Sequence, residues 1–162
     1  MFLYFAYGSN MSRRQMRERC PDHELLGKAV LKDHALCFPR SSPIRHCGVA
    51  GLVERPGAEV WGVVYRLHDR DLAALDRREG YDPAQPFHVN RYDRQIVRVQ
   101  MDGGMVACFV YVARPEPGEH VPSTNYLAAI ITGAEEHGLP TNYVAGLKRI
   151  AARQPGISVA MM

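Results

Sequence analysis

An Asp102-Gly103 dipeptide stands between two segments of alternating polar and apolar residues, and it limits the possible folds more than any other local signal. These segments span residues 87–101 and 105–112. Alternation with a period of two is typical of a half-buried strand, and Asp-Gly is a strong signal for a tight hairpin turn. Other strand-like segments occur earlier, at residues 2–6, 27–31, 35–38, 48–53 and 60–67. The sequence therefore predicts a strand-rich domain that contains at least one antiparallel hairpin.

Helical patterns occur at residues 11–19, 68–79, 124–137 and 141–150. Asp69 is the expected cap of the second helix, and Gly80 is the glycine expected just after its end. Residues 39–43 are predicted as a loop, and residues 55–58 as a turn between two strands. Because most of the helix follows the long strands, the expected class is α+β.

Composition narrows the class of protein. The chain has 162 residues and is 46% hydrophobic, so we expect one domain over residues 1–162, with a weakly ordered tail over about 151–162. No apolar run reaches the ~18–20 residues of a membrane helix. The net charge of +3 is spread along the chain. The arginines of the first helix are expected on a solvated face, which argues against nucleic acid as a partner; these are Arg13, Arg14, Arg17 and Arg19.

Cysteine and histidine usage points to a cytoplasmic protein without a metal. The four cysteines form no C-x-x-C motif, and the N-terminus has no basic lead-in of a signal peptide. The near-neighbour pairs His34-x-x-Cys37 and His46-Cys47 lack a matching partner pair, so no zinc site is expected.

The first candidate site is the turn Tyr7-Gly8-Ser9-Asn10, between a predicted strand and a helix. A glycine turn at a helix N-terminus exposes backbone N–H groups that suit a carboxylate, a phosphate or an oxyanion. The pattern matches neither a Walker loop nor G-x-G-x-x-G. An ordinary turn capped by Ser and Asn explains the same residues, and local pattern favours that explanation.

Two carboxylates form the second candidate. In a helical period Asp76 and Glu79 lie on or beside the face of Leu72 and Leu75. A carboxylate there is either paired or raised in pKa by burial, and a raised pKa suits proton transfer near neutral pH. For Asp76 we favour pairing with a neighbouring arginine or backbone N–H. For Glu79 the two explanations are evenly matched.

Tyr126 is the third candidate, in the first turn of a predicted helix after a proline-rich loop. Its hydroxyl is placed to reach a ligand across a cleft. Packing of the ring against Ile130, one helical turn on, explains the residue equally simply and is the commoner case.

The ordered set of motifs resembles the gamma-glutamylcyclotransferase family, which is related to AIG2-like proteins. The set comprises residues 2–11 (FLYFAYGSNM), 59–65 (EVWGVVY), the L-D-x-x-E-G segment at 75–80, Tyr126, and residues 133–140 (GAEEHGLP). The resemblance implies a small mixed β-barrel with flanking α-helices and a cavity near Tyr7–Asn10. It implies Glu79 as the general acid/base and no cofactor or metal. It also implies that the gamma-glutamyl group is held by Tyr4, Phe5, Ala6, Tyr7, Gly8, Ser9, Asn10 and Tyr126.

The activity that this resemblance implies is a cofactor-free acyl transfer, classed with the lyases. The α-amine of a gamma-glutamyl compound attacks its own γ-carbonyl, which releases 5-oxoproline and an amino acid or amine. Asn10 stands where glutathione-specific relatives generally carry leucine, so gamma-glutamyl amino acids or amines are preferred over glutathione. Residues 81–86 match the family less well, and they are expected to shape the leaving-group side. The expected partner is a small molecule, and the chain is expected as a monomer or homodimer.

A non-catalytic domain of the same fold, which binds a small carboxylate or a gamma-glutamyl group, is the alternative. A pure binding domain has no need of Glu79 on an apolar helix face, so that residue favours the enzyme.

Overall fold

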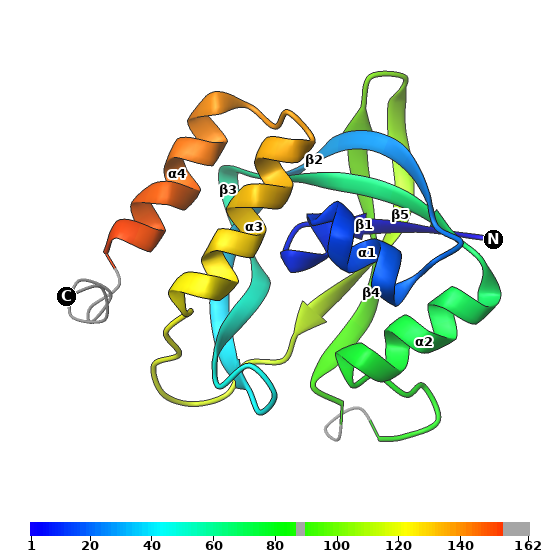
Figure 1. Ribbon diagram of the computed structural model, residues 1–162, viewed down its shortest axis with the longest axis horizontal. Helices are drawn as coiled ribbons and strands as arrows, with labels where there is room; N and C mark the ends of the chain where they lie inside the picture. The colour runs from blue at the N-terminus through cyan, green and yellow to red at the C-terminus, as the bar shows by residue number, and fades with distance from the viewer. Residues whose placement is uncertain (87–89, 154–162) are drawn as a thin grey trace.

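The strands close into a mixed five-stranded barrel in the order β1-β3-β2-β4-β5 (Figure 1). The structure, a computed structural model, describes residues 1–86 and 90–153. Strand β1 is antiparallel to β3 and parallel to β5, and the other neighbours are antiparallel. The strands are β1 (Phe2–Ala6), β2 (Glu24–Ser42), β3 (Cys47–Leu67), β4 (Tyr92–Met101) and β5 (Gly104–Ala113). This barrel confirms the expected α+β class.

Strands β2 and β3 form one long hairpin that wraps around much of the barrel. The strands predicted at 27–31 and 35–38 are both parts of β2, and those predicted at 48–53 and 60–67 are both parts of β3. The loop predicted at 39–43 is wrong because β2 runs to Ser42. The turn predicted at 55–58 is also wrong. Gly57 and Asp33 both have positive φ angles, and Gly57 donates its N–H to Asp33 Oδ1 at 2.9 Å. These irregularities bend a paired ribbon, as bulges do in barrels, and do not reverse the chain.

The Asp102-Gly103 turn is confirmed, because Met101 pairs with Gly104 directly across it. The preceding strand is shorter than the alternation predicted, since β4 begins at Tyr92. Residues 87–89 lie outside the described part of the chain.

The helices flank the barrel, with α3 and α4 on the left of Figure 1 and α2 at the lower right. They are a 3₁₀ turn η1 (Ser9–Met11), α1 (Arg13–Arg19), α2 (Asp69–Glu79), α3 (Thr124–Glu136) and α4 (Thr141–Ala152). The helix predicted at 11–19 is thus split at Ser12, which caps α1 by accepting a hydrogen bond from the N–H of Gln15. No helix in these ranges has the length and apolar character needed to cross a membrane.

Helix ends follow the expected chemistry with two exceptions. Gly80 ends α2 in the left-handed region at φ 70°, as predicted. His68, rather than Asp69, occupies the N-cap of α2, and its side chain makes no capping bond. Helix α4 continues to Ala152, so the first residues of the predicted tail are helical. The rest of that tail, residues 154–162, lies outside the described residues.

The core joins the barrel interior to α3 through η1. Its fully buried side chains include Phe5, Met11, Tyr65, Leu127 and Ile130. Gly133 of α3 packs directly on η1, because a Cβ atom there would lie 2.7 Å from Met11 Cβ. This close approach fixes the distance between α3 and the turn after β1.

Replacing Gly133 with alanine should lower the free energy of unfolding by about 1–3 kcal/mol through overpacking. Gly146 in α4 is the matched control, because a Cβ there meets only the flexible end of Arg149 at 3.6 Å. Gly146→Ala should be neutral or stabilise by up to about 1 kcal/mol through helix propensity. Urea denaturation of both variants tests this, and equal stabilities would contradict the close contact.

Candidate active site

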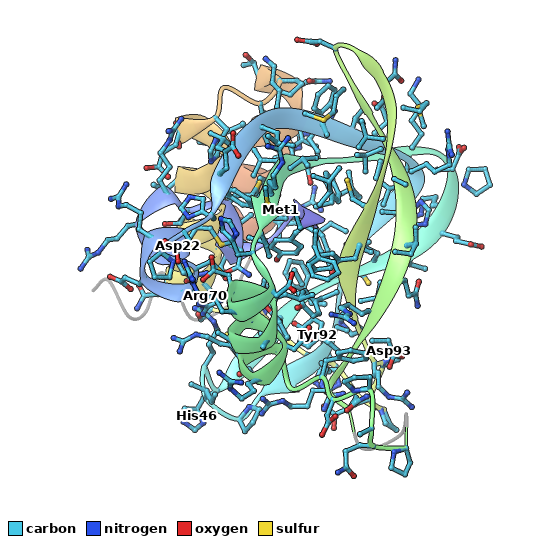
Figure 2. All side chains as sticks on the ribbon, turned by 90° about the vertical axis from the view of Figure 1, so that its right-hand side faces the viewer. Met1, Asp22, His46, Arg70, Tyr92 and Asp93 are labelled. Carbon is cyan, nitrogen blue, oxygen red and sulfur yellow. The ribbon has the colours of Figure 1, made fainter. Side chains whose placement is uncertain are left out.

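A cavity of about 310 Å³ opens between η1, the β2–β3 turn, the C-terminal end of α2 and the start of β4. Figure 2 labels His46 in the β2–β3 turn and Tyr92 at the start of β4, both in the lower part of the molecule. Most of the residues predicted from the sequence line this cavity: Tyr4, Tyr7, Gly8, Ser9, Asn10, Glu79 and Tyr126. Phe5 and Ala6 do not, because both are buried in the core. The fold thus brings the first and second candidate motifs to one place.

The side-chain amide of Asn10 connects these motifs. Its Oδ1 accepts hydrogen bonds from Arg19 Nη1 at 2.7 Å and from Gln15 Nε2 at 2.8 Å. Two donors on one atom identify that atom as the carbonyl oxygen, so the NH₂ group faces the other way. There Nδ2 donates to the Tyr4 hydroxyl at 2.9 Å and to Glu79 Oε1 at 3.3 Å.

Glu79 lies at the last position of α2 with its carboxylate against Asn10. Burial raises the pKa of this carboxyl, and Arg19, the Asn10 amide, Arg45 and Arg91 oppose that rise. Desolvation dominates, so the carboxyl holds a proton at a higher pH than a free glutamate does. One carboxylate oxygen is engaged by Asn10, which leaves Glu79 able to exchange a proton with a group in the cavity.

Asp76 has the paired role that the helical pattern favoured, with different partners. Its carboxylate accepts hydrogen bonds from Arg94 at 3.0 Å and from the Tyr111 hydroxyl at 2.5 Å. Neither Arg77 nor Arg78 is involved, because the partners come from strands β4 and β5 on the other side of the helix. Asp76 therefore anchors α2 to the barrel and does not line the cavity.

The Tyr126 hydroxyl reaches across the site to the barrel. It accepts a hydrogen bond from the N–H of Ala50 at 2.8 Å, and the ring lies beneath the Arg45 guanidinium at 4.9 Å from its centroid. The side chain is 5% exposed. Tyr126 thus lines the cavity and also satisfies a buried backbone donor of β3.

The sequence interpretation missed the arginines of the cavity. Arg19, expected on a solvated face, is half-buried and bonded to Asn10. Arg45, from the β2–β3 turn, donates to Ser9 Oγ at 3.3 Å and to Gln15 Oε1 at 3.1 Å. Four further arginines line the same space: Arg40, Arg77, Arg78 and Arg91. No local motif marks them, because they come from five separate segments.

The backbone of η1 adds donors to this cationic wall. The first hydrogen bond within η1 runs from the N–H of Met11 to the Gly8 carbonyl at 3.1 Å. The N–H groups of Ser9 and Asn10 precede that bond and have no partner within the helix. Among the described residues, no three His, Cys, Asp or Glu side chains gather as metal ligands would. The site therefore combines one carboxyl of raised pKa with donors and cations suited to an anionic ligand.

Known proteins are similar to this chain in sequence and in fold. A family model described as "Gamma-glutamyl cyclotransferase, AIG2-like" matches residues 4–128. The gamma-glutamylcyclotransferase of Bos taurus is 34% identical over 154 residues, which cover 92% of this chain and 78% of the relative. That of Homo sapiens is 33% identical over 153 residues with the same coverage.

The fold is also similar to that of solved structures. A protein described as "Gamma-glutamyl cyclotransferase" superposes with a TM-score of 0.81 at 34% identity, covering 91% of this chain and 86% of that one. YkqA from Bacillus subtilis gives a TM-score of 0.77 at 27% identity, covering 95% of this chain and 55% of that one. The chain belongs to the gamma-glutamyl cyclotransferase, AIG2-like family, and the resemblance drawn from its motifs is confirmed.

Tyr126→Phe should lower the free energy of unfolding by about 1–3 kcal/mol, because it leaves the buried N–H of Ala50 without an acceptor. Tyr81→Phe is the matched control, since the Tyr81 hydroxyl has no hydrogen-bond partner among the described residues. Chemical denaturation compares them, and equal losses would show that the bond from Ala50 contributes nothing to stability.

Glu79→Gln should gain stability relative to the wild type as the pH rises. A carboxyl whose pKa is raised by folding favours the native state below the ordinary glutamate pKa and loses that advantage as the pH rises through the raised value. The amide cannot ionise, so the difference in unfolding free energy should grow from pH 4 towards pH 8 (roughly the range spanning ordinary and raised carboxyl pKa values). The exposed Glu119→Gln controls for the chemical change. A gain that shrinks with pH would contradict the burial of Glu79.

Proposed function

We propose that this protein is a gamma-glutamylcyclotransferase that forms 5-oxoproline, with Glu79 as its general acid/base. The observation that carries the proposal is the position of the Glu79 carboxyl in the cavity, held by Asn10 and raised in pKa by burial. A carboxyl of this kind is suited to moving protons near neutral pH.

The reaction needs a nucleophile that the substrate itself carries. Glu79 takes a proton from the α-ammonium group, and the free amine attacks the γ-carbonyl carbon to form a C–N bond and a five-membered ring. The resulting tetrahedral intermediate collapses with cleavage of the old amide C–N bond. The ring nitrogen carries two protons after the attack and gives one of them up to the departing nitrogen. Glu79 returns its own proton to the same nitrogen, so the products are 5-oxoproline and a protonated amine. Holding the substrate in its folded conformation supplies much of the rate, since intramolecular orientation is worth up to ~7–11 kcal/mol.

The turn end of the cavity is suited to the α-carboxylate of the gamma-glutamyl group. A permanent negative charge is best matched by a permanent cation, and Arg45 lies there bonded to Ser9 Oγ. The N–H groups of Ser9 and Asn10 supply further donors at the same end. This assignment requires the α-amine to lie within hydrogen-bonding distance of Glu79, to which it loses its proton.

The tyrosines of the cavity stay neutral hydrogen-bonding groups throughout. Burial raises the pKa of Tyr126 to about 12 and raises the pKa of Tyr4 well above its usual value. Both hydroxyls therefore keep their protons at physiological pH, and neither acts as the base in place of Glu79. Both can orient the gamma-glutamyl chain, which is the role expected for them from the family resemblance.

Three accompanying expectations stay predictions: a location in the cytoplasm, a monomer or homodimer, and a reaction without cofactor or metal. The cysteines Cys20, Cys37, Cys47 and Cys108 are free thiols.

Glu79→Gln should lower 5-oxoproline release by about 10²–10⁴-fold, the usual contribution of a general base, and leave substrate binding largely intact. Release is measured on several gamma-glutamyl amino acids, gamma-glutamyl-ε-lysine and glutathione, with Glu119→Gln as the matched control. Full activity of the Glu79→Gln variant would remove Glu79 from the mechanism. No release from any compound by a folded wild-type protein that still binds one of them would favour the non-catalytic binding domain.

A further inference from the structure

Three arginines at the α2 end of the cavity have no hydrogen-bond or ion-pair partner for their guanidinium groups among the described residues. Arg77 and Arg78 are exposed in the last turn of α2, and Arg91 is half-buried just before β4. Within residues 1–86 and 90–153, no acceptor lies within hydrogen-bonding distance of any of the three guanidinium groups. The nearby Arg94 differs from these three arginines, because its guanidinium forms an ion pair with Asp76 at 3.0 Å.

The charge of the cavity is strongly unbalanced. Six arginines line it, whereas Glu79 is the single acidic residue among the described residues of the lining. Arg40 is paired with Glu116 at 3.4 Å and donates to two backbone carbonyls. Setting aside Arg40 and one cation for Glu79 leaves four guanidinium groups without a compensating charge.

These cations also lie close enough to repel one another. The pKa of the Arg19 guanidinium is lowered first by burial, an effect that the charge of Glu79 opposes, and it is lowered further by the positive charges of Arg78 and Arg45. Crowding of like charges around a cavity is unfavourable when the cavity holds only water, and a bound anion relieves it. The site is therefore built for a ligand that carries several negative charges.

Arg91 is held in place by backbone contacts. Its N–H donates to the Gly80 carbonyl at 3.1 Å, and its side chain packs so closely on Gly80 that a Cβ atom there would collide with the guanidinium. The guanidinium thus lies against Gly80, the residue that follows Glu79. This places a cation beside the proposed proton donor.

We infer that the preferred leaving group is an acidic amino acid, whose two carboxylates face Arg77, Arg78 and Arg91 while the gamma-glutamyl α-carboxylate lies at the Arg45 end. This inference rests on the proposed cyclotransferase function. A neutral leaving amino acid brings one carboxylate to three unpaired cations, and a lysine linked through its ε-nitrogen brings an ammonium group together with its carboxylate. An aspartate or glutamate leaving group supplies the second negative charge.

The experiment compares isosteric substrates that differ by one charge. Gamma-glutamyl-glutamate is set against gamma-glutamyl-glutamine, and gamma-glutamyl-aspartate against gamma-glutamyl-asparagine. A charge-assisted contact predicts about tenfold or greater preference in kcat/KM for the acid of each pair. The preference should fall to about threefold or less in Arg77→Gln/Arg78→Gln and in Arg91→Gln. Arg98→Gln, which removes the same single charge as Arg91→Gln at an exposed residue outside the cavity, should keep it.

A second measurement on the wild type covers the case in which an arginine variant fails to fold. Raising the ionic strength to about 1 M shortens the screening length to about 3 Å, so the acid-over-amide ratio should shrink. Equal kcat/KM values for acid and amide, or a preference that survives both variants and salt, would overturn the inference and leave the cyclotransferase function standing. No release from any gamma-glutamyl compound would overturn the function itself, and the inference with it.

Discussion

The side-chain amide of Asn10 joins two parts of the molecule that are far apart in the sequence. Arg19 and Gln15 bind its oxygen, so its nitrogen must face Tyr4 and Glu79. With this orientation the amide presents an N–H donor to one carboxylate oxygen of Glu79. It also fixes η1 against the end of α2. The amide can hold this position because β1, which precedes the turn, is paired within the barrel, and because Gly133 of α3 packs closely against η1.

Burial of Glu79 is the second constraint, and it opposes stability. Desolvation raises the pKa of its carboxyl, and the neighbouring arginines only partly offset that rise. A carboxyl that is costly to ionise in the native state exchanges protons at a higher pH than a free glutamate does, which suits the proposed proton transfer. The arginines that moderate the burial line the ligand space themselves, so one set of charges tunes the acid and attracts anionic ligands. Stability is given up here where the proposed chemistry requires it.

The sequence predicted turns and helix ends well where the preferences of a few neighbouring residues decide them. The Asp102-Gly103 turn, the glycine after α2 and the start of α3 follow from backbone preferences that act within a few residues. The long β2–β3 ribbon was not predicted, because Pro56 and Gly57 are turn formers in isolation. Within the barrel the same residues are bulges that allow a 21-residue strand to bend and stay paired. Closure of the sheet, a long-range constraint, overrides the local preference.

Short motifs were enough to predict the class and the family, both of which are confirmed, and to single out most of the residues of the proposed site. The N-terminal turn and Glu79 could be singled out because each carries its chemistry in a few residues at a strand end or on a helix face. The folded chain was needed to show that Phe5 and Ala6 face the core, that Asp76 anchors α2, and that the cavity is ringed by arginines. A guanidinium reaches far from its backbone, so arginines from separate segments converge on one space without leaving any periodic trace in the sequence.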